Sequence, residues 1–128
     1  MPEFIDDPTI ENDAELWRRV HPKLIVADEN RNSIRVSTAA FNDPSMSVVL
    51  AKAVLESGRT ARDVLVGREG FALTSITAGL ARECNQGIAR DPVDDEVAHA
   101  VVFGNKPRSV KKTFVRHSQW VIPPVVAM

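Results

Sequence analysis

Three polar side chains stand close together in a short, otherwise apolar stretch. Arg35, Ser37 and Thr38 lie within Ile-Arg-Val-Ser-Thr. Alternate side chains of a strand point to opposite faces, so Arg35 and Ser37 share one face and Thr38 takes the other. A guanidinium beside a hydroxyl can hold a phosphate or carboxylate, which makes Arg35 and Ser37 candidate catalytic residues and Arg35 and Thr38 candidate ligand-binding residues. The alternative is an outer-face arginine paired with an acid such as Asp43.

His99 is the next candidate, because it is the one polar residue in an apolar run from Val97 to Phe103. A buried imidazole needs hydrogen-bond partners, and its protonation responds to its neighbours. His99 is therefore a candidate general acid or base at the sheet. A core histidine bonded to a backbone carbonyl is the alternative.

Basic residues gather at two places. Arg18 follows Trp17, and an arginine beside an aromatic ring can bind nucleotides, so Arg18 is a candidate ligand-binding residue. Four basic residues near the C-terminus are candidate contacts for a partner or a phosphate: Arg108, Lys111, Lys112 and Arg116. The alternative for Arg18 is a solvated position beside Trp17, and the alternative for the four C-terminal residues is a solvated helix face. The three histidines are too widely spread for a metal site, and no metal or cofactor is expected.

Composition and charge narrow the class of protein. The 128 residues fit one domain, and the single cysteine, Cys84, excludes an internal disulfide. A net charge of −1 argues against a generic nucleic-acid binder, although the segment after Glu96 carries basic residues and no acidic ones. No apolar run reaches about 18 residues, and the acidic start lacks a signal-peptide pattern. We therefore expect a cytoplasmic protein without a membrane span.

The first half of the chain predicts the elements that must position these residues. Residues 1–12 form an acidic, extended or loosely ordered segment, and residues 13–128 form a single domain. The pattern then favours the following elements: a short helix over 14–20 capped by Asp13, with a strand over 16–20 as the alternative; a hairpin of strands 23–27 and 34–38; and a helix over 46–56 capped by Ser45 or Ser47. This last helix is apolar on nearly every side, so we expect it to be the core helix.

The second half mixes turns, strands and helices. Gly58 is expected to end the core helix in a left-handed conformation. The remaining elements are predicted in order: a short helix over 61–66 capped by Thr60; a strand from 71 to about Thr77, then a short helix ending before Gly87; a loop over 88–96; a central strand over 97–103; a helix over 110–118 capped by Ser109; and a strand over 120–122. Residues 71–86 also fit a single helix.

These elements indicate an α+β fold. A small twisted sheet of four to five short strands is expected, packed with two main helices. Regular alternation of strand and helix is not evident, which argues against a doubly wound parallel sheet.

Several motifs resemble those of a group of small bacterial proteins to which no activity is attached. The motifs are Trp17-Arg18-Arg19-Val20, the run Arg-Val-Ser-Thr-Ala-Ala-Phe over 35–41, Met46-Ser47-Val48 and Ala98-His99-Ala100. The resemblance covers most of residues 14–122. It implies no known activity.

A more distant resemblance concerns ADP-ribosyltransferase-like and RES-type toxin domains. An early arginine, a strand of serine and threonine and a later polar residue are similar in layout. The resemblance implies an arginine that holds NAD phosphates, at Arg18 or Arg35, and polar residues around the nicotinamide ribose, at Ser37 or Thr38. Candidates for the catalytic glutamate are Glu83 and Glu96.

Three functions follow from these observations. The favoured one is a small cytoplasmic bacterial interaction or regulatory domain that acts through a protein partner or by self-association, because no catalytic motif is found. The second is a nucleotide-binding enzyme, NAD-consuming if the distant resemblance holds, in which Arg35, Ser37 and His99 converge on one pocket. The third is nucleic-acid binding through the basic helix near the C-terminus.

Overall fold

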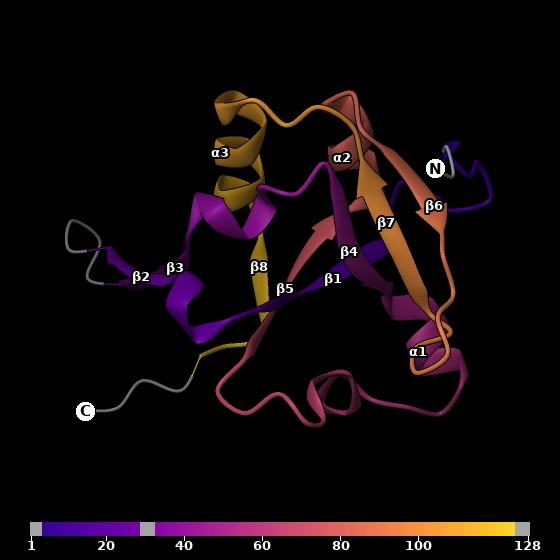
Figure 1. Ribbon diagram of the computed structural model, residues 1–128, viewed down its shortest axis with the longest axis horizontal. Helices are drawn as coiled ribbons and strands as arrows, with labels where there is room; N and C mark the ends of the chain where they lie inside the picture. Colours follow the sequence, from indigo (N-terminus) through magenta and orange to yellow (C-terminus); the bar gives the residue numbers. More distant parts are fainter. Residues whose placement is uncertain (1–3, 29–32, 125–128) are drawn as a thin grey trace.

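The computed structural model describes residues 4–28 and 33–124, and its centre is a six-stranded sheet in the order β6–β7–β4–β1–β5–β8 (Figure 1). Every neighbouring pair in this sheet is antiparallel. Its strands are β1 (Glu15–Val20), β4 (Ser45–Leu50), β5 (Ala72–Thr77), β6 (Gly87–Arg90), β7 (His99–Phe103) and β8 (Gln119–Ile122). A separate hairpin pairs β2 (Ile25–Asp28) with β3 (Ser33–Val36). The α+β class is confirmed, but the sheet has six strands where four to five were predicted.

The described residues contain three α-helices, of which only the last exceeds two turns. They are α1 (Ala51–Glu56), α2 (Ala78–Glu83) and α3 (Arg108–His117). Three short 3-10 segments connect the strands: η1 (Pro22–Leu24), η2 (Thr38–Phe41) and η3 (Ala61–Leu65). Within the described ranges, no helix is long and apolar enough to cross a bilayer.

The sheet consists of two three-stranded halves that are joined over a very short ladder. β1 pairs with β5 over six residues, but with β4 over only two pairs, Leu16 with Leu50 and Trp17 with Val49. Beyond Trp17 the two strands separate, as Figure 1 shows. A gap therefore opens in the middle of the sheet, where backbone groups need other partners.

Apolar side chains cover both faces of the sheet. One face packs beneath α3 and η2, where the rings of Phe114 and Phe41 meet edge to face at 5.6 Å between centroids. The other face packs beneath α1 and η3, with Trp17 at the centre of that smaller cluster. Burying a large side chain such as Phe114 stabilises the fold by about 1.5–3 kcal/mol.

The predicted core helix over 46–56 is wrong in its first half. Residues Ser45–Leu50 form β4, between β7 and β1, and only Ala51–Glu56 are helical. Val48, Val49 and Leu50 are all buried, because the second half of β4 is covered on both faces, whereas Ser45 and Ser47 are exposed. A strand that is covered on both faces loses the alternation that would distinguish it from a buried helix.

Three smaller predictions are also wrong. Glu15–Val20 is a strand and not the helix capped by Asp13, which leaves the alternative over 16–20 as the better description. The predicted loop over 88–96 begins as an edge strand, β6. The residue that precedes α3 is Pro107, so Ser109 lies inside the helix and does not cap it.

Other predictions are confirmed. The hairpin forms from β2 and β3, and the ambiguous stretch divides into β5 and α2 at Thr77, whose hydroxyl accepts from the amide of Leu80. The inner strand around His99 and the last strand also form, as β7 and β8. Gly58 takes φ +83°, the left-handed conformation that ends α1.

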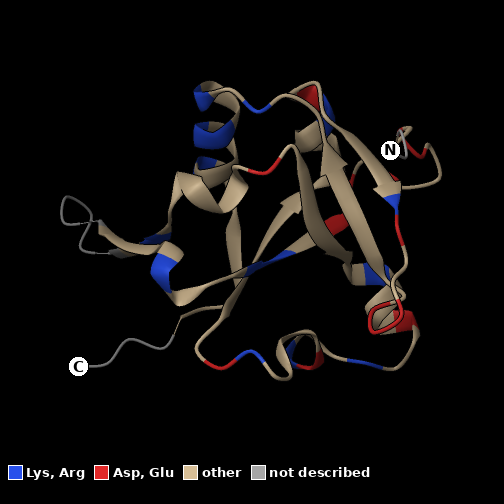
Figure 2. Cartoon of the chain, in the orientation of Figure 1, with Lys and Arg blue, Asp and Glu red and all other residues tan. Residues whose placement is uncertain are grey.

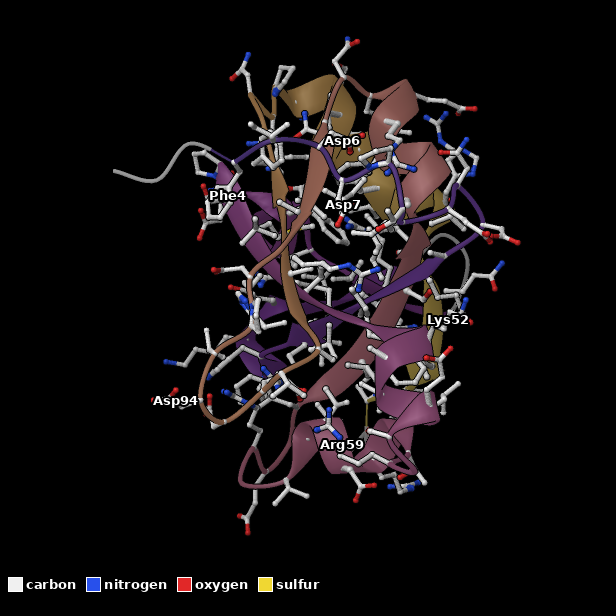
Figure 3. The ribbon with its side chains drawn as sticks, turned by 90° about the vertical axis from the view of Figure 1, so that its right-hand side faces the viewer. Phe4, Asp6, Asp7, Lys52, Arg59 and Asp94 are labelled. Atoms are coloured by element: carbon white, nitrogen blue, oxygen red, sulfur yellow. The ribbon has the colours of Figure 1, made fainter. Side chains whose placement is uncertain are left out.

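The acidic N-terminal segment is bound to the edge of the sheet. The amide of Asp7 donates to the carbonyl of Ile88, and a carboxylate oxygen of Asp6 accepts from the amide of Ile88. Asp6 also pairs with Arg82 at 3.2 Å, and Asp7 with Arg90 at 3.2 Å. Figure 3 shows Asp6 and Asp7 lying across this side of the molecule. These charges therefore compensate arginines of α2 and β6.

The buried side chain of Lys106 links two chain segments at one end of the sheet. Its side chain is almost fully buried, and its ammonium donates to the carbonyls of Val102 at 2.8 Å and Pro44 at 3.1 Å. These bonds tie the residue that precedes β4 to the end of β7. Burial lowers the pKa of Lys106 to about 8, with Asp43 acting in the opposite direction.

We predict that the contribution of Lys106 to the free energy of unfolding increases between pH 8 and pH 10.5, because the unfolded chain still holds the proton that the folded chain has released. In denaturant unfolding, the free energy of unfolding of the wild type should rise by roughly 2–3 kcal/mol relative to that of Lys106→Met across this range. Lys112→Met, on the exposed face of α3, is the control and should show no such trend. A constant difference between wild type and Lys106→Met would contradict the prediction.

Candidate functional site

A cleft of about 470 Å³ opens where β1 and β4 separate. Its polar lining comes from six residues in five segments: Arg18, Arg19, His21, Ser47, Arg68 and His99. Phe71 supplies an aromatic wall, and Asp95 and Glu96 supply the acidic groups. We call this site the arginine cleft. Its volume is within the usual range for small-molecule sites.

Arg18 fills the gap between the separating strands. Its Nε donates to the carbonyl of Ala40 at 3.1 Å, and its Nη1 donates to the carbonyl of Ser47 at 2.8 Å. The guanidinium thus supplies the donor that a continuing β1–β4 ladder would have given to Ser47. Desolvation lowers the pKa of Arg18, while the nearby carboxylate of Asp43 acts in the opposite direction.

Glu96 is the buried anion of the site. Its side chain is 5% exposed and forms a two-point pair with Arg59, in which Arg59 Nη1 lies 3.0 Å from Oε1. Arg19 Nη2 lies 3.6 Å from the same carboxylate, and the amide of Ala98 donates to it. The hydrogen bonds from Arg59 hold the pKa of Glu96 below its usual value of 4.5 against the effect of burial. Figure 3 shows Arg59 beside the loop that carries this carboxylate.

Arg68 is the exposed cation of the cleft. Its guanidinium carbon lies 5.9 Å from the centre of the Phe71 ring, and the His21 ring meets the same ring at a 5.1 Å centroid separation. Among the described residues, no carboxylate lies within ion-pair distance of Arg68. Its charge is therefore available to a ligand.

His99 lines the cleft, and Asp91 sets the orientation of its ring. Nδ1 is 2.7 Å from the backbone oxygen of Asp91 and 3.4 Å from a carboxylate oxygen of the same residue. A carbonyl oxygen only accepts, so Nδ1 carries a proton, and in the neutral ring Nε2 has a lone pair. The bond to a backbone carbonyl that the sequence offered as the alternative is therefore present, at Nδ1. The ring nevertheless lines the cleft.

The other predicted site residues lie elsewhere. Arg35 is exposed on β3 and donates to the carbonyl of Val36, and the hydroxyl of Ser37 caps η2 by accepting from the amide of Ala39. Thr38 begins η2. Of the residues described, these three are absent from the lining of the arginine cleft, which holds Arg18 and His99. The geometry required for an enzyme site of Arg35, Ser37 and His99 is therefore not seen.

The four predicted basic contacts lie on α3 (Figure 2), and none of them lines the arginine cleft. Arg108, Lys112 and Arg116 are exposed, and Lys111 donates to the side chain of Asn42 at 2.8 Å. In the described parts of the chain, none of the four pairs with an acidic residue. The described residues also contain no group of three potential metal ligands.

Arg19, Arg68 and Glu96 are the site residues that the sequence left unassigned or misassigned. Arg19 stood beside Arg18 in the same motif and faces the opposite side of β1. Glu96 was a candidate catalytic glutamate only through a distant resemblance, and its two-point pair with Arg59 is a structural role. Arg68 followed Gly67 in a segment that reads as an ordinary turn, so no local signal marked it.

We predict that Glu96→Gln destabilises the protein by about 2–3 kcal/mol, because it leaves Arg59 and Arg19 beside a neutral group. Glu56→Gln is the control, since the exposed Glu56–Lys52 pair contributes about 0.5 kcal/mol or less. The stabilisation by Glu96 is fully present above pH 4.5 and is lost as the pH falls through its lower folded pKa. Denaturant unfolding should therefore show the stabilities of the wild type and Glu96→Gln becoming equal at acidic pH. Equal stability at neutral pH would contradict the assignment.

The comparisons with known proteins leave the site to be judged by its geometry. No protein family, curated protein or solved structure matches the chain. The two resemblances drawn from the sequence motifs therefore stay predictions.

Proposed function

We propose that the chain binds a small phosphate-bearing ligand of the nucleotide class in the arginine cleft. The observation that carries this proposal is a cavity of about 470 Å³ lined by three arginines: Arg18 and Arg19, which point to opposite faces of β1, and Arg68. Guanidinium groups bind phosphate oxygens in a planar, two-point geometry. Arg59 compensates the buried carboxylate of Glu96, which leaves the cleft with excess positive charge.

The donors of the cleft are arranged in a way that suits an anion. The Nδ1 atom of His21 accepts from the amide of Lys23 at 3.0 Å, so its proton sits on Nε2, where it can be donated. Arg68 lies near the Phe71 ring at the mouth, where a flat ring could also pack. Arg18 and Arg19 are partly committed to backbone carbonyls, so they are held in place before a ligand arrives.

We predict that inorganic phosphate or a member of a panel of NAD, ADP-ribose and ATP binds the wild type and raises its unfolding temperature. A ligand at a hundred times its dissociation constant stabilises the fold by about 2.7 kcal/mol. Arg68→Ala should weaken binding by roughly tenfold or more without loss of stability, because Arg68 is exposed and unpaired among the described residues. Calorimetric titration measures the affinity.

Arg62→Ala is the matched control for this experiment. Arg62 is an exposed arginine on η3, six positions from Arg68, and it does not line the arginine cleft. The Arg62→Ala variant should bind these ligands with the affinity of the wild type. No binding of any of these ligands by the wild type, or equal losses in Arg62→Ala and Arg68→Ala, would contradict the proposal.

A second candidate is a domain that acts through a protein partner, and one observation favours it. Arg108, Lys112 and Arg116 recur every four residues on the exposed face of α3, so they form a single basic stripe. A groove elsewhere on the same chain is lined by acidic residues, among them Glu11, Asp13 and Glu56. A second copy of the chain would offer a complementary surface to the stripe.

We predict for this second candidate that the wild type self-associates at low salt and dissociates at high salt, as measured by sedimentation velocity. Reversal of the stripe in Arg108→Glu/Lys112→Glu/Arg116→Glu should abolish association, because charge attraction between exposed groups drives it. A monomer at every salt concentration and protein concentration tested would contradict self-association. Salt-sensitive binding to RNA or DNA, lost in the same variant, would favour the nucleic-acid alternative.

A further inference from the structure

Trp17 carries a buried hydrogen-bond donor that has no acceptor among the described residues. The side chain is 4% exposed and lies within the apolar cluster beneath α1 and η3. Buried indole N–H groups normally find a partner, so an unpaired one calls for an explanation. Trp17 also lines a small cavity of about 30 Å³ next to the arginine cleft.

Trp17 and His99 both line the small cavity. Arg18, Arg19, Ser47 and His99 line both the cavity and the arginine cleft. The strand register places Trp17 opposite Val49, and Val49 opposite His99, so the indole and the imidazole lie on the same face of the sheet. Because Nδ1 of His99 donates to the carbonyl oxygen of Asp91, Nε2 of the neutral ring is an acceptor.

We propose that this cavity holds a water molecule between Trp17 and His99, and that His99 activates it to hydrolyse a phosphate ester bound in the arginine cleft. The cavity is large enough for one water, which needs about 10–15 Å³ and two to four polar partners. The indole N–H donates to the water oxygen, and Nε2 accepts one of its protons. The inference rests on the proposed binding of a phosphate-bearing ligand.

The step is a displacement at phosphorus. The water oxygen attacks the phosphorus atom while Nε2 of His99 takes a proton from the water. The phosphorus–oxygen bond to the ester group breaks, and its electron pair leaves with the ester oxygen. The imidazolium then returns its proton to that oxygen, so one ester and one water give one alcohol and one phosphate.

The chain's residues divide this work between them. His99 is the catalytic base, and Trp17 orients the water. Asp91 is a positioning residue, because it keeps the Nδ1 proton in place through its carbonyl and lies close with its carboxylate. Arg19 and Arg68 line the cleft, and their guanidinium groups are the donors that would stabilise the charge that develops on the phosphoryl oxygens.

The test uses p-nitrophenyl phosphate and bis(p-nitrophenyl) phosphate as probes, in the presence of EDTA to silence contaminating metal-dependent phosphatases. Release of p-nitrophenolate by the wild type is expected. His99→Gln should lower kcat at least about 100-fold, since general base catalysis contributes 10²–10⁴-fold, while inorganic phosphate still binds in a calorimetric titration. His117→Gln, a substitution of the histidine at the end of α3, is the control and should retain the wild-type rate.

Each result has a distinct meaning. Phosphate binding without release from either probe overturns the hydrolytic step and leaves the proposed function standing. Absence of phosphate binding overturns the proposed function and this inference together. An equal rate in His99→Gln and the wild type removes His99 as the base. Loss of turnover in Ser47→Ala as complete as in His99→Gln would show that a serine hydroxyl, and not water, is the nucleophile.

The water itself is tested on the unmodified protein, because Trp17 is buried and its variants could fail to fold. A nuclear Overhauser effect between water and the indole proton of Trp17 is expected, and none is expected for the indole of Trp120, which donates to the carbonyl of Ile34. A Trp17 indole proton without contact to a long-lived water overturns the proposal.

Discussion

The short ladder between β1 and β4 is the constraint on which the rest of the structure depends. Two residue pairs hold the halves of the sheet together, and the strands then separate. The side chain of Arg18 supplies the missing donor to Ser47, which stabilises the opening without closing it. The arginine cleft exists because the sheet divides here, and the buried pair of Glu96 and Arg59 fixes the loops that form its outer wall.

The sequence correctly predicted those parts of the fold that depend on residues close together in the chain. The hairpin of β2 and β3 and the boundary at Thr77 follow from turn residues and a capping hydroxyl. Failure came where tertiary burial overrides the local pattern. The second half of β4, residues 48–50, is apolar on both faces because two clusters cover it, so the alternation of a strand is confined to the first four residues. β6 is only four residues long and depends on the N-terminal segment for its outer hydrogen bonds.

The sequence predicted those site residues that have unusual neighbours along the chain. Arg18 next to a tryptophan and His99 within an apolar strand both line the cleft. Arg35 and Ser37 had the right chemistry and the wrong location, since alternation within a strand says nothing about which sheet the strand joins. Arg68 and the orphan donor of Trp17 could not be found from the sequence, because most of the residues that line the cleft and the cavity with them come from distant parts of the chain.

The central claim is that the arginine cleft, and not the basic stripe of α3, receives a phosphate-bearing ligand. The most direct measurement is a ¹H–¹⁵N NMR titration with inorganic phosphate and ADP-ribose that follows backbone amides and arginine Nε–H signals. The account predicts saturable shifts at Arg19, Arg68 and His99, with the signals of Arg108 and Arg116 unchanged. Shifts confined to α3, or no saturable shift at all, would contradict it.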